Sequence, residues 1–209
     1  MSLPERSITV LVAALGGEGG GVMADWLMHA ATACGYPAQA TSIPGVAQRT
    51  GATTYYLEIF PAQREALGGR EPVMSLTPSP GNVDMMVASE LLEAGRAMQN
   101  GYVTPDRTTL IASTHRIYAT MEKMQMADGR FSSERVLAAA KQLAQRAVLF
   151  DMRQLAQDSG TVINAVLFGA MAGSGALPLP REACEAAIRR AGKGAEASLR
   201  GFAAGYDIA

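Results

Sequence analysis

Apolar residues follow two patterns along this chain: short continuous runs, and longer stretches in which they recur every three or four positions. The first run, residues 7–15 (SITVLVAAL), is rich in β-branched residues and suits a strand buried on both faces of a parallel sheet. Residues 22–35 then place Val22, Trp26 and Ala30 at helical spacing and stop at Gly35, which readily ends a helix. The pattern predicts a strand, a glycine loop and a helix in that order.

The alternation of strand and helix patterns continues through most of the chain. It predicts strands at 37–44, 52–60, 83–89, 108–114 and 147–152, helices at 90–101 and 132–145, and a solvated loop or hairpin at 61–72. After Asp151 only helical stretches follow, at 161–175, 179–192 and 194–206. We therefore expect an α/β fold with a Rossmann-like open, mostly parallel sheet, helices on both faces and a helical C-terminal segment.

Length and charge narrow the class of protein. The 209 residues, 48% of them hydrophobic, are sufficient for one well-buried domain over 1–209, although the chain can also be the N-terminal part of a longer one. The net charge of −1, with acids and bases interspersed, disfavours nucleic acid and an anionic membrane surface as partners. No secretory signal and no membrane-length apolar run are visible, so we expect a cytoplasmic protein.

The cysteines and histidines are too few for a metal centre. Cys34 and Cys184 are far apart and cannot supply the four thiolates of an iron–sulfur cluster. His29 and His115 are the only histidines, so a zinc site is also poorly supported. No pair of acid, base or thiol stands out as catalytic, and we predict neither a metal ligand nor a catalytic residue in this chain.

The glycine loop GGEGGG, residues 16–21, is the first candidate site. It lacks the G-x-G-x-x-G spacing of a dinucleotide site, and the second strand ends in Thr41 and Ser42 where a ribose-binding acid is needed. No Lys-Ser or Lys-Thr follows it, so it is not a Walker A loop. Backbone N–H groups at a helix N-terminus still attract anions, while a tight turn with only a structural role is the alternative.

A second loop lies within residues 42–56, SIPGVAQRTGATTYY. Arg49 and the flanking Gly45 and Gly51 stand between two predicted strands, at the end of the sheet that should also hold the first glycine loop. A guanidinium there can bind a carboxylate or a phosphate with two parallel hydrogen bonds. A surface arginine that faces solvent or a local acid is the simpler alternative.

Three motifs together resemble the gamma-type domain of the 2-oxoacid:ferredoxin oxidoreductases, most closely the beta subunit of indolepyruvate oxidoreductase. The loop at Gly17–Gly21 is similar to a G-x-G-G-Q-G motif before an apolar helix, with Glu18 where glutamine is usual. Residues 45–51 are similar to G-x-x-x-R-G-G, with Thr50 where glycine is usual. Residues 164–170 resemble N-x-x-x-x-G-A, and PGVAQRTGATTYYLE resembles the aryl-pyruvate branch.

The resemblance implies a reaction that this chain cannot perform alone. Such enzymes oxidatively decarboxylate a 2-oxoacid on thiamine diphosphate, pass electrons through iron–sulfur clusters to ferredoxin, and transfer the acyl group to coenzyme A. The chain has no thiamine-type G-D-G motif with paired asparagines and no cluster cysteines. A larger partner subunit is therefore implied to carry thiamine diphosphate, Mg²⁺ and the clusters, with coenzyme A as cosubstrate.

The residues expected near coenzyme A or the partner come from these three motifs. They are Gly17, Glu18, Gly19, Gly20, Gly21, Ser42, Gly45, Gln48, Arg49, Thr50, Gly51 and Asn164. A homodimer is plausible for the isolated chain, because an uncovered partner-binding surface tends to self-associate. The alternative function is a stand-alone α/β nucleotide-binding module with a regulatory or carrier role, which the glycine loop alone also supports.

Overall fold

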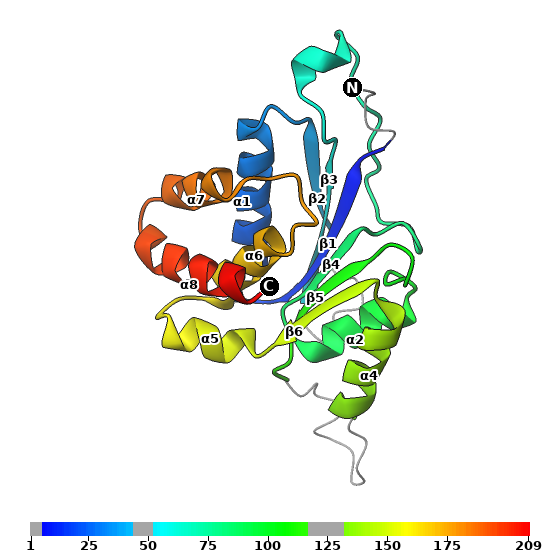
Figure 1. Cartoon of the computed structure of the whole chain (residues 1–209), viewed down its shortest axis with the longest axis vertical. Helices are drawn as coiled ribbons and strands as arrows, with labels where there is room; N and C mark the ends of the chain where they lie inside the picture. Colours follow the sequence, from blue (N-terminus) through cyan, green and yellow to red (C-terminus); the bar gives the residue numbers. More distant parts are fainter. Residues whose placement is uncertain (1–5, 44–51, 117–131) are drawn as a thin grey trace.

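A six-stranded sheet forms the centre of the protein, as a computed structural model shows (Figure 1). The structure describes residues 6–43, 52–116 and 132–209. The strands lie in the order β2-β3-β1-β4-β5-β6. Their bounds are β1 Ile8–Leu15, β2 Ala38–Ile43, β3 Ala52–Ile59, β4 Met85–Ala88, β5 Thr109–Ser113 and β6 Arg146–Phe150.

The sheet is mostly parallel, as the sequence predicts, with one reversed strand. β1, β4, β5 and β6 pair in parallel, whereas β3 runs antiparallel to both β1 and β2. The reversal follows from chain length: only residues 44–51 join β2 to β3, and a parallel crossover needs a dozen residues or more. The pairing brings Ala52 opposite Leu15, so the start of β3 lies at the carboxyl edge of β1.

Helices cover both faces of the sheet unequally (Figure 1). One face carries α1 and the helices that follow β6, and the other carries α2 and α4. The bounds are α1 Gly20–Ala33, η1 Arg64–Leu67, α2 Leu91–Gln99, α4 Ser133–Leu143, α5 Met152–Asp158, α6 Ile163–Gly173, α7 Arg181–Arg190 and α8 Ala195–Ile208. Because α1 and α2 leave the sheet on opposite faces, the neighbouring strands β1 and β4 flank a topological switch point.

Strand β1 explains how one apolar run serves two cores. Val10, Val12 and Ala14 belong to the core under α1 and α6, while Leu11 and Ala13 belong to the core under α2 and α4. Side chains alternate along a strand, so a strand covered on both faces must be apolar at every position. The continuous run read from the sequence reflects this double burial.

Two local elements differ from the sequence prediction. The strand predicted to reach residue 152 ends at Phe150, because the Asp151 carboxylate accepts a hydrogen bond from the Gln154 backbone N–H at 2.9 Å and starts α5. The loop predicted at 61–72 contains the short 3-10 helix η1. The three predicted C-terminal helices are confirmed as α6, α7 and α8.

Helix α6 is the buried centre of the helical layer. Every residue from Ile163 to Ala172 is buried, and the Phe168 ring lies 5.8 Å from that of Trp26 and 5.5 Å from that of Phe202. Glycines let α8 approach closely: a Cβ on Gly169 would lie 2.0 Å from the Phe202 carbonyl oxygen. The described helices include none that is both long and apolar enough to cross a membrane.

This contact predicts a large difference between two helical Gly→Ala changes. Gly169→Ala should lower the free energy of unfolding by about 3 kcal/mol, because the added methyl group meets backbone that cannot move independently. Gly95→Ala in α2 is the control, since its Cβ would meet Val136 at an ordinary 3.6 Å and alanine favours helix by about 1 kcal/mol. Urea unfolding measures both; equal stability of the two variants would contradict the packing.

Candidate functional site at the carboxyl edge of the sheet

The turn from β1 into α1 consists of glycines held against neighbouring side chains. Gly17 and Gly19 have φ values of 86° and 75°, in the left-handed region that favours glycine. A Cβ on Gly19 would lie 2.6 Å from Asn164 Nδ2, and one on Gly20 would lie 2.8 Å from the Tyr55 ring. Gly17 is therefore required by backbone conformation, Gly20 by close packing, and Gly19 by both.

Asn164 ties this turn to the helical layer. Its side chain is buried at the start of α6, and its Nδ2 donates to the Gly19 carbonyl oxygen at 3.3 Å. Two elements predicted from separate motifs, at 17–21 and at 164–170, thus meet in space. The sequence alone did not place them in contact.

The N-terminus of α1 has no side-chain cap. Gly19 occupies the N-cap position, no side chain bonds the first-turn N–H groups, and the first turn contains no acid. The first N–H groups of a helix have no partner within the helix, and the helix dipole adds positive potential there. The end of α1 at the switch point is thus chemically suited to an anionic group.

Glu18 does not cap α1 but faces the loops after β4 and β5. Its Oε1 lies 3.7 Å from His115 Nε2, and both side chains are largely buried. Its backbone N–H donates to the Leu15 carbonyl at 3.1 Å, which closes the turn. Within the described part of the chain, Glu18 Oε2 and His115 Nε2 are buried and have no hydrogen-bond partner.

Serine side chains hold this group of residues together. The Ser89 hydroxyl, after β4, accepts the Leu15 backbone N–H at 3.1 Å. The Ser113 hydroxyl, at the end of β5, accepts the Met152 N–H at 3.0 Å and lies 2.7 Å from His115 Nδ1. When that hydroxyl donates to Nδ1, the neutral ring carries its proton on Nε2, facing Glu18.

The surroundings of Glu18 favour its charged form. Burial by itself raises the pKa of the carboxyl, but contacts with His115 and Ser89 outweigh it and lower the pKa below its ordinary value. The edge therefore contains a fixed negative charge beside an uncapped helix N-terminus. The two unpartnered polar atoms of Glu18 and His115 indicate that a further polar group belongs here.

The predicted site residues fall into three groups. Gly17, Glu18, Gly19, Gly20 and Gly21 lie together with Asn164, as described above. Ser42 is exposed near the end of β2, opposite Tyr55 and separated from β1 by β3. The remaining predicted residues lie outside the described residues: Gly45, Gln48, Arg49, Thr50 and Gly51.

Ser89, Ser113, His115 and Tyr55 were not among the predicted site residues. Three of them were marked by a readable signal, since Ser89, Ser113 and His115 come at or just after the ends of the apolar runs MMVA and LIAS. Polar residues at the carboxyl ends of adjacent parallel strands converge on one edge. No group of three His, Cys, Asp or Glu side chains in the described ranges could hold a metal ion.

Comparisons with known proteins assign the family. The sequence model of the pyruvate ferredoxin/flavodoxin oxidoreductase family matches residues 9–208, nearly the whole chain. This chain belongs to that family. Its matched region includes both the glycine turn and Asn164. The comparison with curated proteins gives no match.

Solved structures share the fold of this family member at low sequence identity. A pyruvate oxidoreductase subunit from Thermotoga maritima is 19% identical with a TM-score of 0.64, and 97% of each chain is covered. The gamma subunit of a keto/oxoacid ferredoxin oxidoreductase from Geobacter sulfurreducens is 16% identical, with a TM-score of 0.63 over 96% of this chain and 97% of that one.

A longer chain contains the same fold. The 2-oxoglutarate:ferredoxin oxidoreductase from Magnetococcus marinus, solved with 2-oxoglutarate, coenzyme A and succinyl-CoA bound, is 13% identical with a TM-score of 0.65. The match covers 98% of this chain but 31% of that one. The fold thus occurs both as a separate subunit-sized chain and within a longer polypeptide.

The lowered pKa of Glu18 predicts a pH-dependent contribution to stability. A carboxyl with a depressed folded pKa stabilises fully above its unfolded pKa of about 4.3, and this stabilisation is lost as the pH falls through the folded value. Glu18→Gln should therefore be less stable than the unmodified chain at pH 7, with the difference shrinking on acidification below about pH 4.

Urea unfolding of both chains from pH 7 to pH 3 measures this difference. Glu65→Gln, at an exposed carboxylate, is the control and should show little change in stability at any pH. A Glu18→Gln difference that stayed constant over this pH range would contradict the contact with His115.

Proposed function

We propose that this chain is a subunit of an indolepyruvate (aryl-pyruvate) ferredoxin oxidoreductase, and that it is the subunit that holds neither thiamine diphosphate nor iron–sulfur clusters. The enzyme oxidatively decarboxylates a 2-oxoacid to an acyl-CoA. Family membership supports the oxidoreductase class. The similarity of PGVAQRTGATTYYLE to the aryl-pyruvate branch supports the substrate class. A stand-alone nucleotide-binding module is the alternative, which the glycine turn before α1 is equally compatible with.

The need for a partner follows from what the reaction requires. The sequence has two cysteines and no thiamine motif, so another subunit would supply the groups for decarboxylation and electron transfer. The structural relatives from Thermotoga and Geobacter are themselves described as subunits. In this proposal a larger subunit holds thiamine diphosphate, Mg²⁺ and the clusters, ferredoxin accepts the electrons, and the complex works in the cytoplasm.

The observation that carries the proposed role of this chain is the uncapped N-terminus of α1 at the switch point, beside unpartnered polar atoms of Glu18 and His115. In the complex, this edge faces the coenzyme A phosphates or the rim of the partner's active site. Coenzyme A, when bound, supplies the thiol that takes up the acyl group. The α1 N–H groups and Arg49 suit a phosphate, and the Glu18 carboxylate suits a hydrogen-bond donor.

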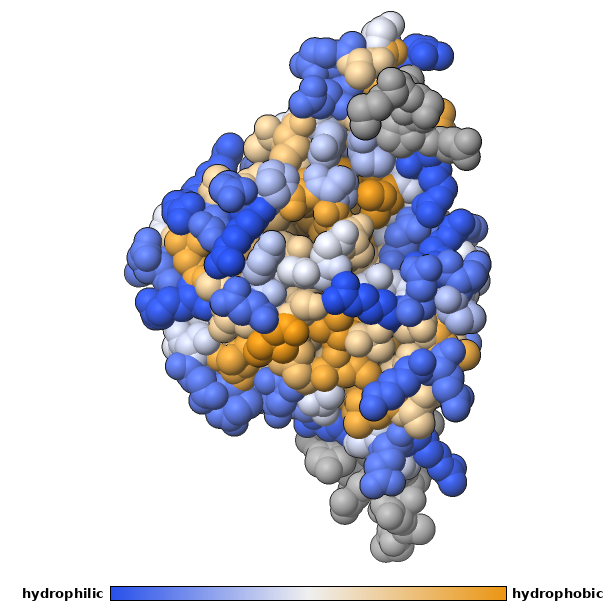
Figure 2. All heavy atoms as spheres, viewed as in Figure 1, coloured by the Kyte–Doolittle hydropathy of each residue, from blue (hydrophilic) through white to orange (hydrophobic). Residues whose placement is uncertain are grey.

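An apolar surface near this edge suits a partner subunit. β6 has no neighbouring strand on its outer side among the described strands, and Phe150 and Leu155 beside it are only partly buried. Figure 2 shows apolar side chains gathered over this part of the molecule, with polar ones around it. Apolar surface rimmed by polar residues is typical of protein interfaces, and in the isolated chain it favours a homodimer.

Co-expression tests the subunit proposal. A thiamine- and cluster-bearing subunit encoded beside this chain should co-purify with it and form acyl-CoA from indolepyruvate, whereas neither subunit alone should do so. The readouts are size-exclusion chromatography and reduction of ferredoxin. Failure of the two subunits to associate and to form acyl-CoA together would overturn the proposal.

Arg49 provides a test of the coenzyme A contact. Arg49→Ala should raise the KM for coenzyme A about tenfold, because a charge-assisted hydrogen bond to phosphate contributes roughly 1.5–3 kcal/mol. The control is Arg190→Ala, at an exposed arginine in the last turn of α7, which should leave the KM unchanged. If Arg49→Ala altered neither this KM nor the stability of the complex, the proposed role would be wrong.

A further inference from the structure

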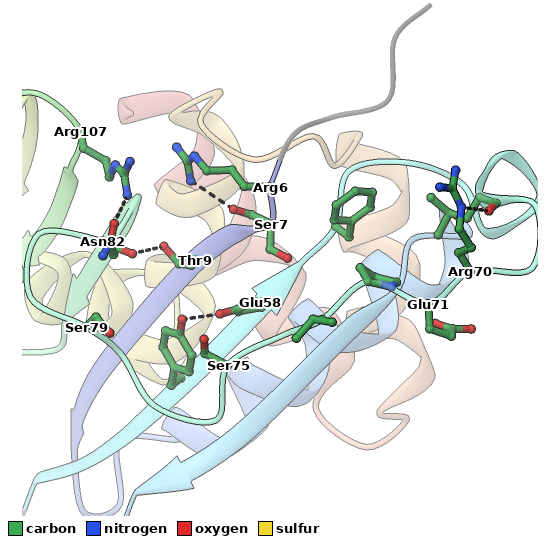
Figure 3. Close-up of a pocket in the computed structure, with 15 residues that line it drawn as sticks. Arg6, Ser7, Thr9, Glu58, Arg70, Glu71, Ser75, Ser79, Asn82 and Arg107 are labelled. Carbon is green, nitrogen blue, oxygen red and sulfur yellow. Dashed lines mark hydrogen bonds between the residues drawn. The ribbon is translucent and has the colours of Figure 1, made fainter.

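A cavity of about 530 Å³ lies at the opposite end of the sheet from the glycine turn. Its lining includes Arg6 and Ser7 just before β1, Asn82 before β4 and Arg107 before β5, so it sits at the amino ends of the parallel strands. Figure 3 shows Arg6, Ser7, Thr9, Asn82 and Arg107 on one side of it. None of the residues of the carboxyl-edge site lines this cavity.

The cavity exists because no helix covers this part of the sheet. α2 and α4 cover the face over β4 and β5, whereas the connection from β3 to β4 crosses the face over β2 and β3. Gln39 Nε2 donates to the Ser75 carbonyl at 2.9 Å, and Thr41 Oγ1 donates to the Leu76 carbonyl at 2.7 Å. A thin segment of coil fixed by such bonds leaves room that a packed helix would fill.

Polar residues replace apolar ones on the sheet beneath this segment. In the pairing register, Gln39 of β2, Glu58 of β3 and Thr9 of β1 stand side by side across three strands. A sheet face that only supports a core is apolar at such positions. Gln39 and Thr9 bond the Ser75 and Asn82 carbonyl oxygens, so Glu58 is the member of the row whose role needs explaining.

Glu58 is the central member of the row, and it is an acid that is largely withdrawn from solvent. It is 6% exposed, and its Oε1 accepts a hydrogen bond of 2.6 Å from the Tyr56 hydroxyl. Burial and the neighbouring carboxylate raise the pKa of Tyr56, so the phenol keeps its proton and remains a donor. In the described part of the chain, no cation pairs with Glu58, and because the carboxylate lines the cavity, it is available to a hydrogen-bond donor there.

Three arginines line the cavity, and neighbouring side chains hold two of them. Arg6 bonds Asp84 through both terminal nitrogens at 2.7 Å, and Arg107 donates to Asn82 Oδ1 at 2.7 Å. Arg70 is different: its Nε donates to the Leu67 carbonyl, and its two terminal nitrogens have no partner among the described residues. Figure 3 shows Arg70 well separated from Glu58 along the cavity.

We propose that this cavity binds a nucleoside diphosphate, with the ribose hydroxyls donating to Glu58 and the phosphates facing Arg70. A carboxylate that accepts from a ribose diol and a guanidinium that pairs with phosphate are the two polar contacts such a ligand needs. Phe60, Leu67 and Pro72 add apolar surface to the lining. The volume lies within the range of small-ligand pockets.

The position of Glu58 also predicts what the cavity rejects. A phosphate on the ribose 3′-oxygen, as in coenzyme A, would replace one donor with an anion beside a buried carboxylate. Coenzyme A should therefore not bind here, which separates this site from the carboxyl edge where we place coenzyme A. The inference does not depend on the proposed oxidoreductase role.

Calorimetric titration of the whole chain with ADP, GDP, CDP and UDP tests the proposal. At least one should bind with a Kd below about 1 mM, and its 2′-deoxy form should bind about tenfold more weakly because one hydrogen bond to a charged group is lost. Coenzyme A should not compete with it for this site. Absence of binding by all four, or equal binding of the deoxy form, would overturn the proposal.

Variants assign the binding to this cavity. Glu58→Gln keeps an oxygen that can accept from Tyr56 but loses the charge, and should weaken binding about tenfold, as should Arg70→Gln. Glu65→Gln and Arg190→Gln, at exposed positions outside the cavity, are the matched controls and should bind as the unmodified chain does. Thermal unfolding confirms that each variant is folded. If Glu58→Gln and Arg70→Gln left nucleotide binding unchanged, the assignment to this cavity would be wrong.

Discussion

The space between the Tyr55 ring and the Asn164 side chain admits backbone but no side chain, and the rest of the carboxyl edge depends on this restriction. Gly19 passes beside Asn164, and Gly20 passes between Ala14 and Tyr55. Tyr55 belongs to β3 and Asn164 to α6, so the turn is fixed from the sheet and from the helical layer at once. The start of α1 is thereby held at the switch point without a capping side chain.

This restriction also determines where Glu18 can point. The turn closes through the bond from the Glu18 N–H to Leu15, and the side chain then reaches toward His115 and Ser89 instead of folding back on α1. A carboxylate at the N-cap would satisfy the helix N–H groups and compete with any anionic ligand. Directed toward His115, the same carboxylate leaves those N–H groups available while it adds a negative charge nearby.

The sequence predicts the α/β class and all the described strands, because β1, β4, β5 and β6 coincide with short apolar runs and β3 is rich in Thr and Tyr. It also predicts the functional end of the sheet, since GGEGGG follows the strongest run. The reversal of β3 and the contact between Gly19 and Asn164 are products of tertiary packing between residues far apart in the chain. The burial of Glu58 could not be predicted for a similar reason: in ATTYYLEIF it resembles an outward-facing polar residue, and the segment between β3 and β4 that crosses this face is far from it in sequence.

The two ends of β1 therefore have different physical roles. Its eight residues span roughly 26 Å at about 3.3 Å per residue, which separates Thr9 at the cavity from the glycine turn by most of the sheet. The central strands are buried on both faces, and a close-packed sheet of this kind has low compressibility and resists deformation. A ligand beside Glu58 would contact the segment between β3 and β4, which a few side-chain bonds hold to the sheet. Its occupancy should therefore change the stability of that segment more than the geometry of the turn at Gly19.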